Sequence, residues 1–183
     1  MKKLKVPKFL HELHGEQTNI AELLLIYGFA VIGPVILYFT TRTGLPELAW
    51  WRTLLLFVIA ADLSGGIIAN LTYGTTAFYE KRQWRKAVFI LAHAAHPAVL
   101  FLLTREQLPF WVYTGGITLF FSFLTAFAFR QPRQQFFGFI AVCISVAFGF
   151  ILFGTTPFYR TVSILYMLKL IYSFSVDHYG CRE

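Results

Sequence analysis

The sequence has few charged residues and almost no cysteine. Charged residues make up 14% of its 183 residues, whereas about a quarter of a typical soluble domain is charged. Only two cysteines occur, Cys143 and Cys181, without a CxxC pair, which excludes a disulfide framework. No small-residue cleavage site follows the first apolar segment, so we expect that segment to be retained as a span. The shortage of charge indicates that lipid covers much of the outer surface.

Apolar residues are the most abundant class in the sequence. They make up 57% of the chain, and the mean hydropathy is +0.60. A membrane-spanning helix needs about 20 such residues, and six segments of that kind leave little length for a soluble domain. We therefore predict an all-α, polytopic transmembrane helix bundle with six spans at residues 19–177, between a basic segment at 1–18 and a tail at 178–183. The spans are predicted at 19–38, 49–73, 87–103, 109–129, 136–153 and from the 154–157 turn to about 176.

The net charge of +7 is distributed in short basic runs at the ends of the apolar segments. This position argues against nucleic-acid binding and matches the excess of lysine and arginine in cytoplasmic loops. We therefore predict a multi-pass protein of the plasma or inner membrane with both termini in the cytosol. The predicted cytosolic side holds Lys2, Lys3, Lys5, Lys8, Lys81, Arg82, Arg85, Lys86, Arg130, Arg133 and Arg182. The opposite side holds Arg42, Arg52, Arg105 and Arg160.

Two predicted cytosolic segments border the membrane. Residues 74–86 are predicted to be the longest internal loop, and its cations, Lys86 among them, are expected to contact anionic lipid. Residues 9–14 are expected to form a short amphipathic helix at the membrane surface. Membrane lipid is the partner that these segments predict, and the sequence leaves formation of a homo-oligomer open.

Four ionisable residues fall inside predicted spans: Asp62, His93, His96 and Lys169. Such groups are costly in lipid and usually face a protein interior or a wet cavity. With a helical rise of about 1.5 Å per residue, all four lie in one layer between the cytosolic half and the centre of the bilayer. Spans two and three form an antiparallel hairpin, so Asp62 can meet His96. The sequence thus predicts a cytosol-facing polar cavity built from spans two, three and six.

Helical spacing assigns faces to the residues of span two. Asp62, Gly66 and Asn70 recur every four residues and therefore form one stripe. Gly65 and Gly66 lack side chains, so another helix can approach this span closely.

Span three carries a histidine pair followed by proline. His93 and His96 are three residues apart and share a face. Pro97 cannot donate a backbone hydrogen bond and displaces the carbonyl of His93. That carbonyl is left as an acceptor for a side chain, a water or a ligand.

The first functional interpretation is a metal site. Two imidazoles and a carboxylate from the neighbouring helix suit zinc or iron and leave a position for water. We predict Asp62, His93 and His96 as ligands and consider His178 as a fourth, although helical rise places His178 at the interface. A metal-bound water would suit hydrolysis of a lipid or amphiphile, with Lys169 or Asn70 positioning the substrate or an oxyanion. No nucleotide site is indicated, and haem is disfavoured because only span three carries histidines near the membrane centre.

The candidate ligand residues Asp62, His93 and His96 resemble, in residue type, those of intramembrane hydrolases of the alkaline ceramidase and adiponectin-receptor type. Those proteins bind zinc with histidines, an aspartate and a nearby serine, so the resemblance implies a zinc-dependent hydrolase. The order differs, because they have seven spans and a C-terminal HxxxH, whereas here an HxxH lies in span three.

Two other interpretations stay open. Aspartate, histidine and lysine in one layer are the components of a protonation relay, which predicts a proton-linked carrier of a small polar solute or a substrate-binding transport subunit. Alternatively, Asp62 and Lys169 form a buried ion pair that fixes span six on span two. In that case the histidines only hydrogen-bond Asn70, Ser64 and the freed carbonyl, each contact contributing about 1 kcal/mol to helix packing.

Overall fold

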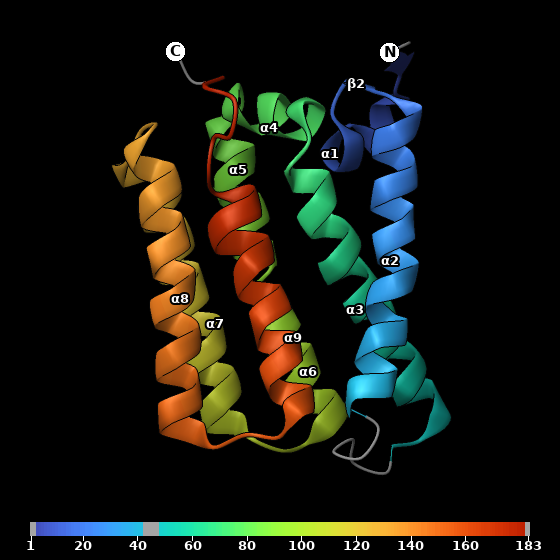
Figure 1. Ribbon diagram of the computed structural model, residues 1–183, viewed down its shortest axis with the longest axis vertical. Helices are drawn as coiled ribbons and strands as arrows, with labels where there is room; N and C mark the ends of the chain where they lie inside the picture. The colour runs from blue at the N-terminus through green and yellow to red at the C-terminus, as the bar shows by residue number, and fades with distance from the viewer. Residues whose placement is uncertain (1–2, 42–47, 182–183) are drawn as a thin grey trace.

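The computed structural model describes residues 3–41 and 48–181. Lys2, Arg42 and Arg182, which entered the prediction of orientation, lie outside the described residues. Helices stand side by side and roughly parallel to the long axis of the molecule, and both chain ends lie at the same end of the bundle (Figure 1).

Within these described residues, five helices are long and apolar enough to cross a membrane. The prediction of a helical membrane protein is therefore supported, and the helix ends lie close to the predicted ones. The third of these helices bends where α5 passes into α6, and the fourth ends in a π-helix. The five are α2 (Ile20–Thr41), α3 (Trp50–Asn70), α5 (Gln83–Ala92) with α6 (Ala95–Thr104), α7 (Leu108–Phe123) with η2 (Leu124–Ala128), and α8 (Arg133–Phe153).

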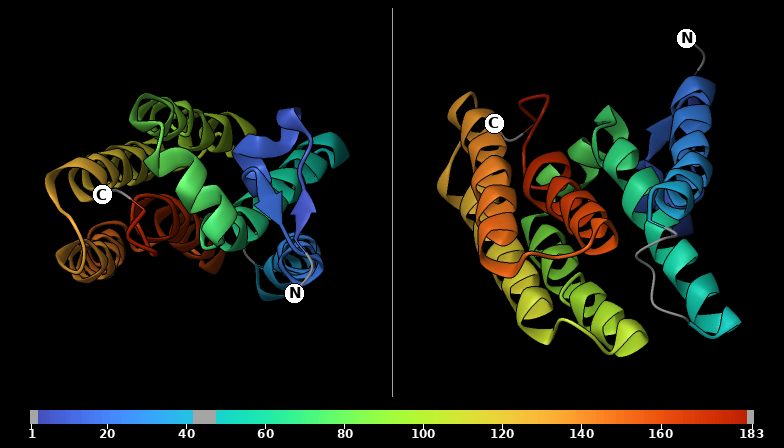
Figure 2. Two further views of the ribbon diagram at one scale, coloured as in Figure 1. Left: turned by 90° about the horizontal axis from the view of Figure 1, so that it is seen from above. Right: turned by 60° about the horizontal axis from the view of Figure 1, so that its bottom comes forward.

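The last long helix differs from these five. It consists of α9 (Pro157–Met167) and the π-helix η3 (Leu168–Phe174), and it carries Arg160 and Lys169. Together the two elements contact α2, α3, α7 and α8, and Figure 2 shows them between α8 on one side and α2 with α3 on the other. No residue from 158 to 178 is exposed, although several are half-buried. Because protein covers most of this helix, its side chains can be more polar than those of a lipid-facing helix.

Glycine allows close approach to α3, as the sequence predicts, but the structure shows two helices there where one was expected. A Cβ added to Gly65 would lie 2.8 Å from the Cβ of Ala30 on α2. A Cβ added to Gly66 would lie 2.5 Å from Cε of Lys169 on η3. Gly65 therefore serves the contact with α2, whereas Gly66 makes room for the lysine.

One end of the bundle is covered by short elements that the sequence did not predict. The N-terminal segment is a two-stranded antiparallel ladder, β1 (Leu4–Lys5) with β2 (Gln17–Thr18), that encloses η1 (Lys8–Leu10) and α1 (His11–His14). The expected amphipathic helix is thus reduced to a 3₁₀ turn and a single α-helical turn. The hydroxyl of Thr75 donates to the Leu13 carbonyl at 3.0 Å and ties this segment to the residues that follow α3.

The prediction of a loop at residues 74–86 is also wrong. Residues Tyr73–Glu80 form α4, and α5 already begins at Gln83. Thr72 caps α4, because its side chain accepts a hydrogen bond from the Thr75 amide. The chain therefore turns from α3 into a short helix that lies across the end of the bundle (Figure 1).

Candidate functional site

The carboxylate of Asp62 meets the ammonium of Lys169 near the middle of α3. The distance from Nζ to Oδ2 is 2.6 Å. The Lys169 side chain is 2% exposed, but that of Asp62 is 47% exposed. The lysine reaches the aspartate along the space beside Gly66. One end of this ion pair is therefore enclosed by protein, and the other opens to the outside of the bundle.

The histidine pair lies where α5 passes into α6. His93 ends α5, and His96 lies in the first turn of α6. The two rings stack with their centroids 4.8 Å apart and their planes within 3°. The His93 carbonyl accepts hydrogen bonds from the His96 amide at 3.1 Å and from the Tyr166 hydroxyl at 2.9 Å. The acceptor that Pro97 was predicted to leave is therefore used partly by a tyrosine of α9.

Asp62, His93, His96 and Lys169 together form what we name the central cluster. Nε2 of His96 lies 2.9 Å from Oδ2 of Asp62, so a hydrogen bond joins the two helices. Nδ1 of His93 lies 2.8 Å from the Phe89 carbonyl. A carbonyl can only accept, so Nδ1 donates and Nε2 of a neutral ring keeps its lone pair. The structure thus connects three of the four residues through the Asp62 carboxylate and holds His93 against them.

The donor set of the central cluster fits a metal ion. Asp62, His93 and His96 each offer one ligand atom, and these atoms lie within 4.8 Å of one another. A backbone carbonyl that fixes the tautomer, as Phe89 does for His93, is typical of metal-binding histidines. Ligands of tetrahedral zinc lie about 2.1 Å from the metal and so about 3.4 Å apart, which requires the three side chains to close together slightly. Lys169 holds Oδ2 of Asp62, which leaves Oδ1 for a metal.

The structure does not bring the other two predicted site residues into this group. The side-chain amide nitrogen of Asn70 is buried without a hydrogen-bond partner among the described residues. The backbone carbonyl of Asn70 accepts from the Thr76 hydroxyl at 3.1 Å. Nε2 of His178 lies 3.2 Å from the Tyr172 carbonyl. Burial holds the pKa of His178 below its usual value, so its ring is mainly neutral near pH 7.

Tyr166 is a residue of this site that the sequence did not single out. It is buried, contacts the ring of His96 with centroids 6.0 Å apart, and orients the turn between α5 and α6 through the His93 carbonyl. A signal was present, because Tyr166 precedes Lys169 by three residues and therefore shares its face of the helix.

A second ion pair, between Glu80 and Lys86, was also missed. The two side chains are 1% and 0% exposed, so the expectation that Lys86 contacts lipid is wrong. Lys86 also donates to the Ser175 carbonyl at 3.0 Å, and Gln134 donates to the same carbonyl at 3.1 Å. We name Glu80, Lys86, Gln134 and Ser175 the terminal cluster, because it joins α4 and α5 to α8 and to the end of η3.

No protein-family model, curated protein or solved structure matches the chain.

Proposed function

We propose that the protein crosses the membrane six times with both termini in the cytosol. Five helices qualify by length and composition, and α9 with η3 runs beside them as a sixth (Figure 1). Short connections and the shared end of the two termini support an even number of crossings. The excess of lysine and arginine at that end supports the orientation. Labelling of single cysteines from each side of the membrane, at Lys5 and at Arg105 in a Cys143→Ser, Cys181→Ser background, tests this topology.

We propose further that the central cluster is the metal centre of a membrane hydrolase that acts on a lipid or amphiphile. The carrying observation is that ligand atoms of Asp62, His93 and His96 lie within 4.8 Å of one another inside two candidate spans. The half-exposed Asp62 supports access from outside the bundle. Because that part of α3 lies within a candidate span, the molecule that reaches it has an apolar portion.

Each residue of the central cluster has a role in this proposal. Asp62, His93 and His96 hold zinc or iron, which when bound supplies a water of lowered pKa. Lys169, which contacts Asp62, offers a positive charge next to the place where an oxyanion develops. Tyr166 and the Phe89 carbonyl fix the histidine pair. Asn70 and His178 were predicted for this site from the sequence, but no contact between them and the cluster supports a role here.

Metal analysis of the purified protein tests the proposal. We expect about one equivalent of zinc or iron in the wild-type protein and none in a His93→Ala, His96→Ala variant. The chain offers a matched control, because His11 and His14 repeat the same spacing outside the candidate spans. A His11→Ala, His14→Ala variant should keep its metal. A folded wild-type protein that stays metal-free after incubation with zinc or iron would refute the metal centre.

A second candidate is a proton-linked carrier of a small solute. It is favoured by the unbroken chain from Lys169 through Asp62 to His96, in which contacts of 2.6 and 2.9 Å already join three titratable groups. Uptake of solute that depends on a pH gradient, and that Asp62→Asn abolishes while the protein still folds, would support the carrier over the enzyme.

A purely structural role is the third outcome. The Asp62–Lys169 pair joins α3 to η3 as that interpretation requires. If the role is only structural, a double Asp62→Leu, Lys169→Leu variant folds and preserves every cellular phenotype, because a well-packed apolar pair can replace an ion pair.

A further inference from the structure

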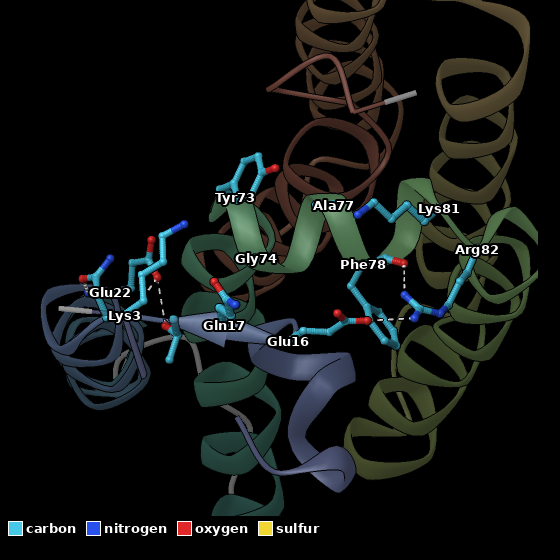
Figure 3. Close-up of a pocket in the computed structure, with 12 residues that line it drawn as sticks. Lys3, Glu16, Gln17, Glu22, Tyr73, Gly74, Ala77, Phe78, Lys81 and Arg82 are labelled. Atoms are coloured by element: carbon cyan, nitrogen blue, oxygen red, sulfur yellow. Dashed lines mark hydrogen bonds and ion pairs between the residues drawn. The ribbon is translucent and has the colours of Figure 1, made fainter. Parts of the chain in front are cut away.

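A pocket of about 600 Å³ opens at the end of the bundle that carries both termini (Figure 3). The N-terminal strand β2, the first turn of α2 and the helix α4 form its walls. Its volume is in the range of small-molecule sites. Three cationic and two acidic side chains line the pocket, and none of them belongs to the central cluster.

Both acidic side chains of the pocket are already engaged. Glu22 accepts hydrogen bonds from the Thr18 hydroxyl at 2.8 Å and the Asn19 amide at 3.1 Å. The Asn19 side chain in turn accepts from the Glu22 amide at 3.0 Å, which completes a reciprocal cap on α2. Glu16 pairs with Arg82 at 2.8 Å, and that hydrogen bond holds the pKa of Glu16 below its usual value. Arg82 thus offsets the charge of Glu16, whereas Glu22 keeps its negative charge, because both of its hydrogen-bond donors are neutral.

Those remaining cations are Lys3 and Lys81. Both are exposed, and neither forms an ion pair with any residue in the described part of the chain. Lys3 lies beside the start of α2 and Lys81 at the far end of α4, so they approach the pocket from different sides (Figure 3). Gln17 and Tyr73 add polar groups between them. The pocket therefore offers two lysines without an ion-pair partner, a net positive charge and neutral hydrogen-bonding groups.

The position of the pocket indicates what kind of anion reaches it. It adjoins the first turn of α2, where a candidate span begins, so it lies at the level of the lipid head groups. Exposed aromatic side chains mark this level, and at this end they include Tyr73 at 54% and Trp84 at 65% exposure. Clusters of lysine and arginine beside a span bind anionic head groups.

We propose that this pocket binds the phosphate of an anionic lipid head group between Lys3 and Lys81. The site is separate from the central cluster and does not depend on the metal proposal. Inorganic phosphate has the same binding chemistry, so the experiment includes it as a separate arm.

The test uses the full-length protein in a neutral detergent. Dihexanoyl phosphatidylglycerol, dihexanoyl phosphatidylcholine and inorganic phosphate are titrated separately, and binding is read by native mass spectrometry. We expect phosphatidylglycerol to bind, and a Lys3→Gln, Lys81→Gln variant to bind it about 30-fold more weakly, or about fivefold for each lysine. A Lys5→Gln, Lys8→Gln variant loses the same charge from exposed residues outside the pocket and should change affinity by less than about threefold.

Each other result overturns the proposal. Equal weakening in both double variants would show a diffuse attraction to the basic end in place of a site. Phosphatidylcholine binding as tightly as phosphatidylglycerol would show that charge does not select the ligand. Inorganic phosphate binding as tightly as phosphatidylglycerol would assign the pocket to the free anion. Unchanged thermal unfolding confirms that both variants fold, since all four lysines are exposed.

Discussion

The central and terminal clusters contain the same kind of ion pair in different surroundings. In the terminal cluster both side chains are at most 1% exposed, and both carboxylate oxygens of Glu80 have partners, Lys86 and Gln83. In the central cluster Lys169 is equally buried, but Asp62 is 47% exposed. Nδ1 of His96 is also buried without a partner among the described residues.

This difference separates a structural ion pair from a candidate site. The terminal cluster uses its hydrogen-bonding capacity to hold α4, α5, α8 and η3 together. The central cluster keeps a carboxylate oxygen and imidazole nitrogens that the fold does not use. Charged groups inside a membrane protein are costly, so unused capacity of this kind is the stronger indication of a ligand.

Removal of one lysine should affect the two clusters unequally. Lys86→Met leaves the Glu80 carboxylate buried and unpaired, so we expect a loss of about 3–5 kcal/mol in the free energy of unfolding. Lys169→Met leaves a carboxylate inside a candidate span that keeps its hydrogen bond to His96, so we expect a smaller loss of about 2–3 kcal/mol. Unfolding in mixed detergent micelles measures both. Equal losses would mean that the central cluster is as structural as the terminal one.

A methyl group beside Lys169 should disturb the central cluster without removing any charge. Gly66→Ala places a Cβ 2.5 Å from Cε of Lys169, so we expect a loss of about 1–3 kcal/mol from overpacking. Gly116→Ala on α7 is the control, because nothing lies within 4 Å of its new Cβ. Helix propensity should leave that variant unchanged or about 1 kcal/mol more stable. A neutral Gly66→Ala would show that the lysine moves aside freely.

Removal of a lysine charge should change metal affinity in the central cluster but not elsewhere. Lys169 holds the carboxylate that a metal would use, so Lys169→Met should tighten zinc binding about tenfold, which corresponds to about 1.4 kcal/mol. Lys81→Met removes the same charge from an exposed residue of α4–α5 and should leave affinity unchanged. Isothermal titration with zinc separates the two. Weaker binding in Lys169→Met would show that the lysine supports the site and does not compete with the metal.

His14 can be compared with His96 of the central cluster, and the expected effect is smaller. In both residues Nδ1 is buried without a partner among the described residues. Nε2 of His14 lies 3.0 Å from the Tyr27 hydroxyl, and burial holds the pKa of His14 below the usual value. The folded segment therefore excludes a proton that the unfolded segment accepts. Its contribution to stability is complete above about pH 6.5 and is lost as the pH falls from there towards the lowered pKa.

Hydrogen exchange of residues 3–18, corrected for intrinsic rates, measures this effect. Protection should decrease between about pH 7 and pH 5 in the wild-type protein, and His14→Gln should flatten the profile. A wild-type profile that is already flat would mean that His14 does not control the docking of the segment.

The central cluster was largely predictable because its position depends on regular geometry. A constant helical rise places Asp62, His96 and Lys169 in one layer, and Gly65 with Gly66 predicts the close approach of another helix. The rotation of the histidine pair was not predictable, since a turn of about 100° in one helix decides it. In the structure, the hydrogen bond from Tyr166 to the His93 carbonyl settles that rotation.

The terminal cluster was not predictable for a different reason. Glu80 and Lys86 occur in a polar, basic stretch that resembles a solvated loop. Only tertiary contacts, such as the bond from Lys86 to the distant Ser175 carbonyl, place them inside. The N-terminal ladder was missed because its two-residue strands are too short for an alternating pattern. The number of crossings and the orientation stay predictions.

A helix that its neighbours largely cover does not need the apolar surface on which membrane insertion of an isolated segment depends. The helix formed by α9 and η3 carries Arg160, Lys169 and several hydroxyl groups, and arginine and lysine each oppose insertion of an isolated segment by about 2.5–3.5 kcal/mol at its centre. During synthesis this last segment is made when the other five already exist. The sixth crossing that we propose would therefore insert against helices that are already present, where the Asp62 carboxylate can pair with Lys169.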